Sequence, residues 1–321
     1  MILILSYNQY EQGTDPVIDW LLYLKADFIK VTVDDLITKT VPYSVDVNTG
    51  KIFINNVCVS DKVNIIFFRR FGEKVSLGDF PDIFPFSQAK FECNHEIQHF
   101  INYLYLLFAD KKWMPHFNAI GLNKLEIIKY AAEINLPTPK SVIVNNKRDA
   151  IKFLSRQNNG IISKPIHHSG YFVMGKQTYS IFTNTFTEEF MNTIPDYFFP
   201  TLLQEKINAH YEIRVFYIDS VFYSTAILIN KEDRDVDIKL NYGKEYVHWV
   251  PYNLPEEYQK KIDMLMKKIG LNTGSIDIIK TTEGNYVFLE VNPVGQYTAP
   301  SNRCNYSVDK IIAEWLIKND N

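Results

Sequence analysis

The first 33 residues constrain the fold more than any other part of the chain. A short apolar run at residues 2–5 has the length and composition of a buried strand. Thr14, Asp15 and Pro16 then mark a helix start, with the proline just inside it, and apolar residues follow at helical spacing. Residues 27–33 are extended again. Strand, helix and strand in this order predict the opening of an α/β unit.

The remainder of the 321 residues, enough for two or three domains, continues to mix strands with helices. The sequence pattern predicts strands at residues 51–59, 63–68, 141–144, 160–164, 202–206, 211–218, 221–229, 273–280 and 285–292. It predicts helices at 87–108, 124–135, 147–157, 255–269 and from 308 onward. Pro137 and Pro139 forbid the second of these helices from continuing. No internal repeat is present.

Composition excludes several classes of protein. With 34 Lys and Arg against 37 Asp and Glu, the net charge of −3 argues against binding nucleic acid by phosphate neutralisation. Three scattered cysteines form neither a disulfide framework nor a spaced zinc site, which favours a reducing compartment. No apolar stretch reaches the roughly 18 residues of a membrane span, and the N-terminal run lacks a basic leading region. We therefore expect a cytoplasmic protein with no nucleic acid and no membrane partner.

The pattern H-E-x-x-H occurs once, at His95, Glu96 and His99. On a helix the two histidines lie one turn apart, where they can bind zinc while the glutamate acts as general base. The predicted helix also carries Phe91 and Leu104, so the histidines can equally flank a packed apolar stripe. Because no motif downstream supplies a third ligand, we keep a zinc peptidase as the less favoured hypothesis.

Two basic residues, Arg69 and Arg70, follow the predicted strand at 63–68. Two guanidinium groups at a strand end suit the bidentate capture of a carboxylate or phosphate. Surface ion pairing is the alternative. We favour the first interpretation, in which Arg69 and Arg70 bind substrate.

The last two strands carry the strongest chemical signal. Glu290 and Asn292 point to the same face of one strand because side chains alternate with period two. A turn at residues 281–284 brings Asp277 opposite them. Three hard oxygen ligands on one face fit Mg²⁺ that bridges nucleotide phosphates. Lys164, at the end of an earlier strand, adds a cation suited to the same phosphates.

Several short segments, spread over most of the chain, together resemble ATP-grasp ligases. They are ILILS at 2–6, TD at 14–15, IDWL at 18–21, FRR at 68–70, NKL at 123–125, LPTP at 136–139, EVNP at 290–293 and GQ at 295–296. More narrowly, the chain resembles the ATP-grasp peptide maturases that make graspetides, the microviridin-like macrocyclases of RiPP pathways. The segments of the first 70 residues are most similar to the grasp-with-SPASM type.

The resemblance implies an α/β ATP-grasp fold in which two α+β lobes clamp the nucleotide. The expected domains are an N-terminal pre-ATP-grasp lobe at 1–115, a central lobe at 116–205 and a C-terminal lobe with the metal ligands at 206–321. The implied ATP-binding residues are Lys124, Lys164, Glu205, Lys206, Ile207 and Glu212, where residues 205–207 form the adenine hinge and Glu212 accepts from ribose. The implied metal ligands, for two Mg²⁺ ions, are Asp277, Glu290 and Asn292. The implied catalytic residues are Arg214 and Lys239.

The implied reaction activates Asp or Glu side chains of a precursor peptide as acyl-phosphates. Ser or Thr hydroxyls, or Lys amines, of the same peptide then displace phosphate and close ω-ester or ω-amide rings. The implied partner is a peptide with a leader segment and a core rich in Thr or Ser and Glu or Asp; homo-oligomers are common in the family, so a homodimer is one expectation. A loop containing Gly170 and Gly175 is the expected lid. Two alternatives stay open: an ATP-grasp amino-acid or protein C-terminal ligase, and a nucleotide-binding regulatory module without turnover.

Overall fold

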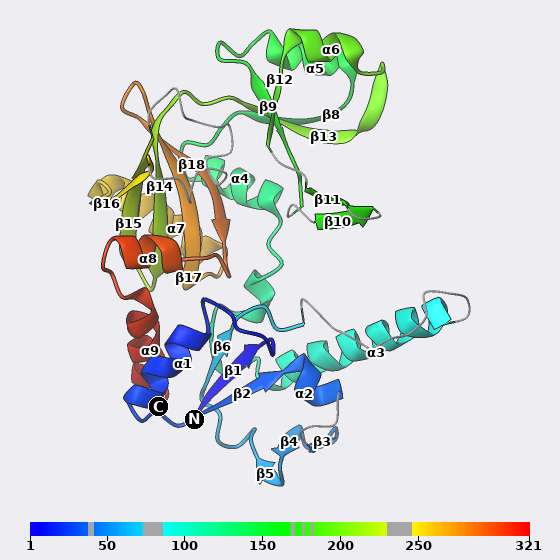
Figure 1. Ribbon diagram of the computed structural model, residues 1–321, viewed down its shortest axis with the longest axis vertical. Helices are drawn as coiled ribbons and strands as arrows, with labels where there is room; N and C mark the ends of the chain where they lie inside the picture. Colours follow the sequence, from blue (N-terminus) through cyan, green and yellow to red (C-terminus); the bar gives the residue numbers. More distant parts are fainter. Residues whose placement is uncertain (38–41, 73–85, 168–170, 175–176, 181–182, 230–245) are drawn as a thin grey trace. The chain divides into compact units, whose positions relative to one another are not determined.

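The computed structural model describes residues 1–37, 42–72, 86–167, 171–174, 177–180, 183–229 and 246–321 (Figure 1). The chain divides into two compact units. The first contains residues 1–121, 271–273 and 293–321, and the second contains 122–270 and 274–292. The C-terminal segment therefore returns to the unit that holds the N-terminus. The boundary predicted between residues 205 and 206 falls inside the second unit, so the three-domain division stays a prediction.

A four-stranded parallel sheet in the order β2-β1-β6-β7 forms the centre of the first unit. Its strands are β1 (Ile2–Ser6), β2 (Phe28–Thr32), β6 (Ile65–Phe68) and β7 (Lys112–Met114). Every residue of β1 and β6 is buried. A strand buried on both faces reads as a continuous apolar run, which is why residues 2–5 identify it in the sequence. The predicted α/β opening is confirmed.

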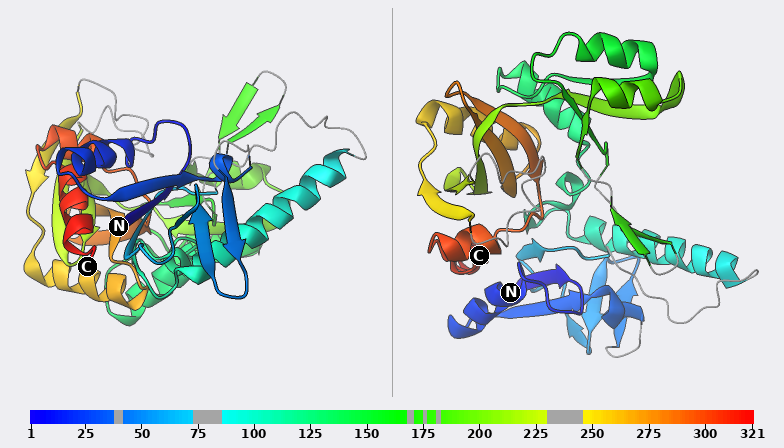
Figure 2. Two further views of the ribbon diagram at one scale, coloured as in Figure 1. Left: turned by 90° about the horizontal axis from the view of Figure 1, so that it is seen from below. Right: turned by 45° about the horizontal axis from the view of Figure 1, so that its top comes forward.

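Five α-helices of the described residues belong to the first unit: α1 (Asp15–Tyr23), α2 (Val33–Ile37), α3 (Phe86–Leu107), α8 (Thr298–Arg303) and α9 (Val308–Lys318). Helices α1 and α9 lie side by side (Figures 1 and 2), and Trp20 Nε1 donates to Asp309 at 2.7 Å. A short 3₁₀ helix spans Phe117–Ala119. Because α9 packs on α1, the last residues of the chain complete the fold of its first residues.

The strand predicted at 51–59 is two strands in the structure. A small antiparallel sheet contains β3 (Tyr43–Asp46), β4 (Lys51–Ile54) and β5 (Val57–Cys58). Asn55 and Asn56 separate β4 from β5, and both have positive φ, +48° and +64°. Asparagine tolerates this conformation better than most residues do, so the pair forms the turn of a hairpin.

Only the C-terminal half of α3 packs against the first unit. Ile101 and Leu104, together with Phe108 just after the helix, are buried in the core, whereas most residues between 88 and 99 are exposed. Figures 1 and 2 show the N-terminal half of α3 extending beyond the sheet of its unit. The predicted apolar stripe therefore covers half of the helix. Among the described residues, none of the helices is long and apolar enough to cross a membrane.

The second unit contains an antiparallel sheet in the order β12-β9-β13-β8. Its strands are β8 (Ser141–Asn146), β9 (Ile161–Lys164), β12 (Asn184–Phe186) and β13 (Tyr197–Glu205). Helices α5 (Lys147–Leu154) and α6 (Glu188–Thr193) lie on one face of it (Figure 1). The side chain of Asn146 caps α5 by accepting from Asp149 N, which fixes the turn from β8 into the helix. A separate two-stranded sheet contains β10 (Tyr171–Met174) and β11 (Gln177–Ser180).

The second sheet of this unit has five strands in the order β16-β15-β14-β17-β18. They are β14 (Ala209–Ile218), β15 (Val221–Leu228), β16 (His248–Tyr252), β17 (Thr273–Thr281) and β18 (Tyr286–Asn292). Two helices, α4 (Lys124–Glu133) and α7 (Glu256–Lys268), complete the unit. Helix α4 ends before Pro137, as predicted, and Pro137 O accepts from Phe288 N at 2.8 Å. The prolines thus end the helix and leave a carbonyl that ties the segment to β18.

Candidate active site

Two lysines converge on one carboxylate in the second unit. Lys124 is the first residue of α4, whose N-cap Asn123 accepts from Leu125 N at 2.9 Å. Lys164 is the last residue of β9. The Nζ atoms of both lysines lie 3.4 Å from Glu290 Oε2. Each of the three side chains is about four-fifths buried, so this cluster carries an excess positive charge with limited access to water.

The three residues of the cluster line a pocket. The other side chains that line it are mainly apolar and come from α4, β13, β18 and the residue after β9: Ile127, Ile128, Pro165, Leu202, Gln204 and Leu289. Gln204 is buried and donates to Ser141 Oγ at 2.9 Å, which fixes its amide. A mainly apolar pocket whose lining includes two lysines suits a ligand with an apolar part and an anionic part.

Asp277, Glu290 and Asn292 lie where the sequence predicts them. In the antiparallel pair β17–β18, Asp277 is directly opposite Glu290, and Ser275 is opposite Asn292. A β-bulge follows at the step from Asp277 to Ile278. Directly opposed carboxylates repel each other unless cations accompany them. The protein supplies these cations, because Arg214 Nη1 contacts Asp277 Oδ1 and the two lysines contact Glu290.

The donor set suits a hard cation. Among the described residues, no group of three or more His, Cys, Asp or Glu side chains is arranged to hold a metal ion. Asp277 and Glu290 supply two carboxylates, and Asn292 adds an amide oxygen, which Mg²⁺ accepts as a ligand and Zn²⁺ in structural sites seldom does. The fit to Mg²⁺ therefore rests on three oxygen donors on adjacent strands.

Arg214 and Glu212 share one face of β14, since they are two residues apart on a strand. Strand β14 is the neighbour of β17 in the sheet, which explains how Arg214 reaches Asp277. The arrangement brings Glu212 to the same side of the sheet as the predicted metal ligands. Lys239, the other predicted catalytic residue, lies outside the described residues, and so do Gly170 and Gly175 of the predicted lid.

The predicted adenine hinge, residues 205–207, begins at the last residue of β13. Two of its amides already donate to backbone carbonyls: Glu205 N to Lys140 O at 2.9 Å, and Lys206 N to Gly160 O at 3.0 Å. The Glu205 side chain accepts from Lys140 N at 2.9 Å. A purine ring that hydrogen-bonds to this hinge must therefore use other groups, such as those of Ile207, unless these bonds exchange.

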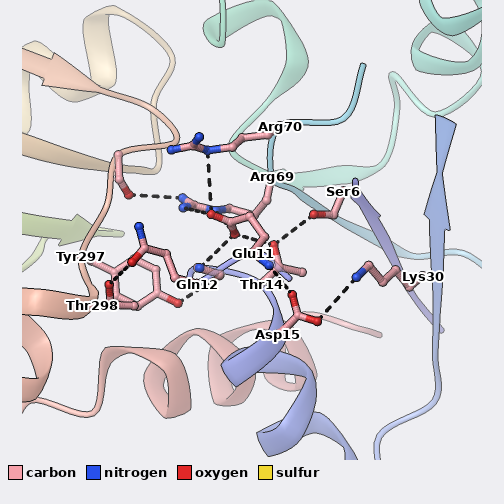
Figure 3. A network of polar contacts seen from close by, with 12 residues as sticks. Ser6, Glu11, Gln12, Thr14, Asp15, Lys30, Arg69, Arg70, Tyr297 and Thr298 are labelled. Atoms are coloured by element: carbon pink, nitrogen blue, oxygen red, sulfur yellow. Dashed lines mark hydrogen bonds and ion pairs between the residues drawn. The ribbon is translucent and has the colours of Figure 1, made fainter. Parts of the chain in front are cut away.

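Arg69 and Arg70 belong to a polar network of the first unit (Figure 3). Arg69 donates from Nε and Nη2 to the two Glu11 carboxylate oxygens, each at 3.5 Å. Arg70 Nε lies 3.8 Å from Glu11 Oε1. Burial alone would raise the pKa of Glu11, but Arg69, the Thr14 hydroxyl and Arg70 together lower the pKa below its ordinary value. The alternative interpretation of these arginines was ion pairing at the surface. Ion pairs are present, but they are internal and join both arginines to Glu11.

His95 and His99 lie on the exposed half of α3. The His95 ring packs edge to face on Phe91, with centroids 4.3 Å apart. Sequence reasoning missed two kinds of residue. Glu11 was missed because an isolated glutamate in a loop carries no pattern. Leu202 and Gln204 could have been found from their spacing, since they share one face of the strand that leads into the hinge.

Known proteins of low sequence identity share the fold of this chain. No protein-family model matches the chain. The α-aminoadipate–LysW ligase LysX of Saccharolobus solfataricus is 25% identical over 201 residues, 61% of this chain and 71% of that protein. The macrocyclase MdnC of Microcystis aeruginosa MRC, solved with its precursor peptide MdnA, matches with a TM-score of 0.82 and 22% identity over 98% of each chain. The protein has the ATP-grasp fold.

A second solved structure matches equally well. It is a RiPP-associated ATP-grasp ligase of Chryseobacterium gregarium, in complex with ADP and a leader and core peptide. Its TM-score is 0.82 at 18% identity, and the match covers 100% of this chain and 98% of that chain. The fold class predicted from the sequence is therefore confirmed.

Proposed function

We propose that this protein is an ATP-dependent ligase that closes rings in a ribosomally made precursor peptide. The observation that carries the proposal is the convergence of Lys124 and Lys164 on Glu290 in the lining of a mainly apolar pocket. Two similar structures hold precursor, leader or core peptides, and one of them also holds ADP. The segments near the N-terminus favour the grasp-with-SPASM type among the graspetide enzymes.

The nucleotide-binding roles are part of the proposal. Ile127, Ile128, Leu202 and Leu289 would form apolar walls for adenine, and the hinge at 205–207 begins one residue after Gln204 of the same lining. Lys124 and Lys164 bind the phosphates, and Glu212 accepts from ribose. Asp277, Glu290 and Asn292 would hold the Mg²⁺ ions, which when bound neutralise phosphate charge. The central and C-terminal lobes that provide these residues are proposed to meet at residue 205.

The chemistry begins when an Asp or Glu carboxylate of the peptide attacks the γ-phosphorus of ATP, which forms an acyl-phosphate and releases ADP. Arg214, with Lys239, stabilises the negative charge of the transferred phosphoryl group. A Ser or Thr hydroxyl oxygen of the same peptide then attacks the acyl carbon, loses its proton and expels phosphate. The product is an ω-ester; attack by a Lys amine gives an ω-amide. We favour the ester, formed in the cytoplasm by a homodimer.

An amino-acid ligase is the second candidate, and the similarity to LysX favours it. As an amino-acid ligase, the protein would use the same nucleotide pocket and the same kind of acyl-phosphate, but a free amine of a second molecule would displace the phosphate. The two functions differ in the product. Ring closure lowers the peptide mass by one water, about 18 Da per ring, because carboxyl and hydroxyl join within one molecule. Ligation raises the mass by one residue.

The test is incubation with ATP, Mg²⁺ and a Thr- and Glu-rich precursor, with mass spectrometry of the peptide and measurement of ADP. We expect dehydrated peptide and about one ADP per ring, and mild alkali should restore the original mass if the bond is an ester. Glu290→Gln and Asn292→Ala should abolish both products with unchanged circular dichroism. Glu283→Gln, at the exposed turn of the same hairpin, is the matched control. ADP release with an added amino acid, and no dehydration, would favour the second candidate.

A further inference from the structure

The structure gives Arg69 and Arg70 different surroundings, although they are adjacent in the chain. The Arg69 side chain is 4% exposed, and its guanidinium is used on several sides. It pairs with Glu11, donates to Gly295 O at 3.3 Å and lies 5.8 Å from the centre of the Tyr297 ring. Arg69 therefore belongs to the internal scaffold of the first unit.

Gly13 shows how closely this scaffold is packed around Arg69. A Cβ atom at position 13 would lie 2.2 Å from Arg69 Nη2. The Tyr297 hydroxyl donates to Gly13 O at 3.0 Å, which holds the backbone in place. A guanidinium enclosed in this way has no open side from which to bind a substrate.

Arg70 is different. Its side chain is 28% exposed, and its one ion pair within the described chain is the 3.8 Å approach of Nε to Glu11 Oε1. That distance is too long for a hydrogen bond. The Nε atom is buried and has no hydrogen-bond partner among the described residues. A buried donor without an acceptor is unfavourable, so an acceptor that neutralises this guanidinium would stabilise the part of the site that the structure describes.

Glu11 lies too far from Arg70 Nε to accept a hydrogen bond, and its carboxylate already accepts from other donors. Oε2 accepts from Gly13 N at 2.9 Å and from the Thr14 hydroxyl at 2.8 Å, and both oxygens accept from Arg69 (Figure 3). The cluster contains two guanidinium groups and one carboxylate, which leaves one positive charge unbalanced. That charge is on Arg70, the residue that reaches solvent.

The backbone of Arg70 supports the same assignment. Its φ is +59°, in the left-handed region that glycine adopts without strain and a long side chain does not. Arg70 follows β6 directly, so this conformation turns the chain at the end of a buried strand. Strained backbone of this kind is often found where a side chain is held for binding.

We propose that Arg70 binds an acidic side chain of the peptide substrate, and that Arg69 has no part in binding. The guanidinium presents a planar fork of donors that matches a carboxylate. The Arg70 side chain is partly exposed although its Nε is buried, so the accessible part of the side chain is where a carboxylate would bind. The inference rests on the proposed function, because it takes the ligand to be a peptide. It replaces the prediction that both arginines contact substrate with a role for one of them.

The test observes the two arginines directly, through the ¹⁵Nε–Hε NMR signals of the intact protein. The probes are N-acetyl-glutamate α-amide, which has only the side-chain carboxylate, and N-acetyl-glutamine, which has only a chain-end carboxylate. N-acetyl-glutamine α-amide is the neutral control. We expect a saturable shift of the Arg70 signal with the first probe and no shift of the Arg69 signal.

Arg70→Gln should weaken binding of the first probe at least about fivefold. The affinity of Arg70→Lys should lie between those of the wild type and Arg70→Gln, because lysine keeps the charge and loses the planar fork of donors. Arg148→Gln, at an exposed arginine of the second unit, should bind as the wild type does. Unchanged binding in Arg70→Gln, a shift of Arg69 instead, or tighter binding of N-acetyl-glutamine would overturn the inference.

Peptide dehydration, measured on the same variants, separates this inference from the proposed function. If the wild type binds the carboxylate at Arg70 but dehydrates no peptide, the proposed function fails and the binding site stands. If Arg70→Gln dehydrates the precursor with an unchanged KM, the proposed function stands and the role of Arg70 is wrong.

Discussion

Replacing Glu11 by Gln is the most informative change that the first unit offers. The Glu11 side chain is 2% exposed and is the counter-ion of both arginines. Gln keeps the size and one acceptor oxygen, but it removes the charge and places an amide N–H₂ group near the guanidiniums. Removal of one partner from a buried ion pair costs about 3–5 kcal/mol. Because Arg70 reaches solvent and can be hydrated, we expect the lower end of that range for the free energy of unfolding.

The same carboxylate makes the stability of this unit depend on pH. The pKa of Glu11 in the folded protein is lower than its ordinary value of 4.5. A lowered pKa means that the stabilisation is fully present above the unfolded value and is lost as the pH falls through the folded value. The difference between the wild type and Glu11→Gln should therefore be constant at neutral pH and shrink on acidification below about 4.5.

Urea unfolding followed by tryptophan fluorescence measures the difference in the free energy of unfolding between the wild type and Glu11→Gln, and most of the tryptophans report on the first unit. Trp20, Trp113 and Trp315 belong to the first unit, and Trp249 is the single tryptophan of the second. Glu314→Gln, at an exposed position of α9, is the matched control and should change stability by less than about 0.5 kcal/mol. A loss below about 1 kcal/mol for Glu11→Gln, or a loss of the same size at pH 3 and pH 7, would refute the argument from a buried, charged partner.

Three further changes test other parts of the structure. Gly13→Ala should destabilise the first unit by about 1–3 kcal/mol in urea unfolding, because the new Cβ overlaps the enclosed Arg69 guanidinium. Lys164→Ala should weaken ATP binding about tenfold in calorimetry and leave peptide binding nearly unchanged; equal losses for both ligands would count against a phosphate contact. Changing His95 and His99 together to Ala should preserve ligase activity and cost less than about 1 kcal/mol, whereas stoichiometric zinc that is lost in this variant would revive the peptidase hypothesis.

The sequence predicted the elements whose patterns are local. Strand β1 was evident because its residues 2–5 are all apolar, and α4 was bounded because Pro137 cannot continue a helix. The predicted helix at 147–157 is three residues too long, since α5 ends at Leu154. Helix α6 was missed because six residues give too short a window for a helical period. Helix α8 was missed for the same reason.

The candidate site shows more clearly that local sequence patterns predict only local contacts. Asp277 opposite Glu290 was predictable, because a short turn and a period of two fix the register of a hairpin. The contact between Lys164 and Glu290 spans 126 residues and joins two different sheets, so no local pattern encodes it. Glu11 shows the converse. The sequence predicted that the two arginines bind substrate, whereas the glutamate that pairs with both of them gave no signal in the sequence.

The charges of the candidate site lead to one more step about how the nucleotide would bind. Three cations, Lys124, Lys164 and Arg214, contact two carboxylates, Glu290 and Asp277. The cations are the residues proposed for the phosphates, and the carboxylates are those proposed for Mg²⁺. Each group thus has a partner of opposite charge within the protein, which avoids the cost of burying unpaired charge before the ligand arrives. On binding, the nucleotide phosphates would replace the carboxylates as partners of the lysines and Arg214, and Mg²⁺ would replace these cations as the partner of the carboxylates. ATP without Mg²⁺ should therefore bind more weakly, because the phosphates then draw the lysines away from Glu290 and leave the two carboxylates facing each other.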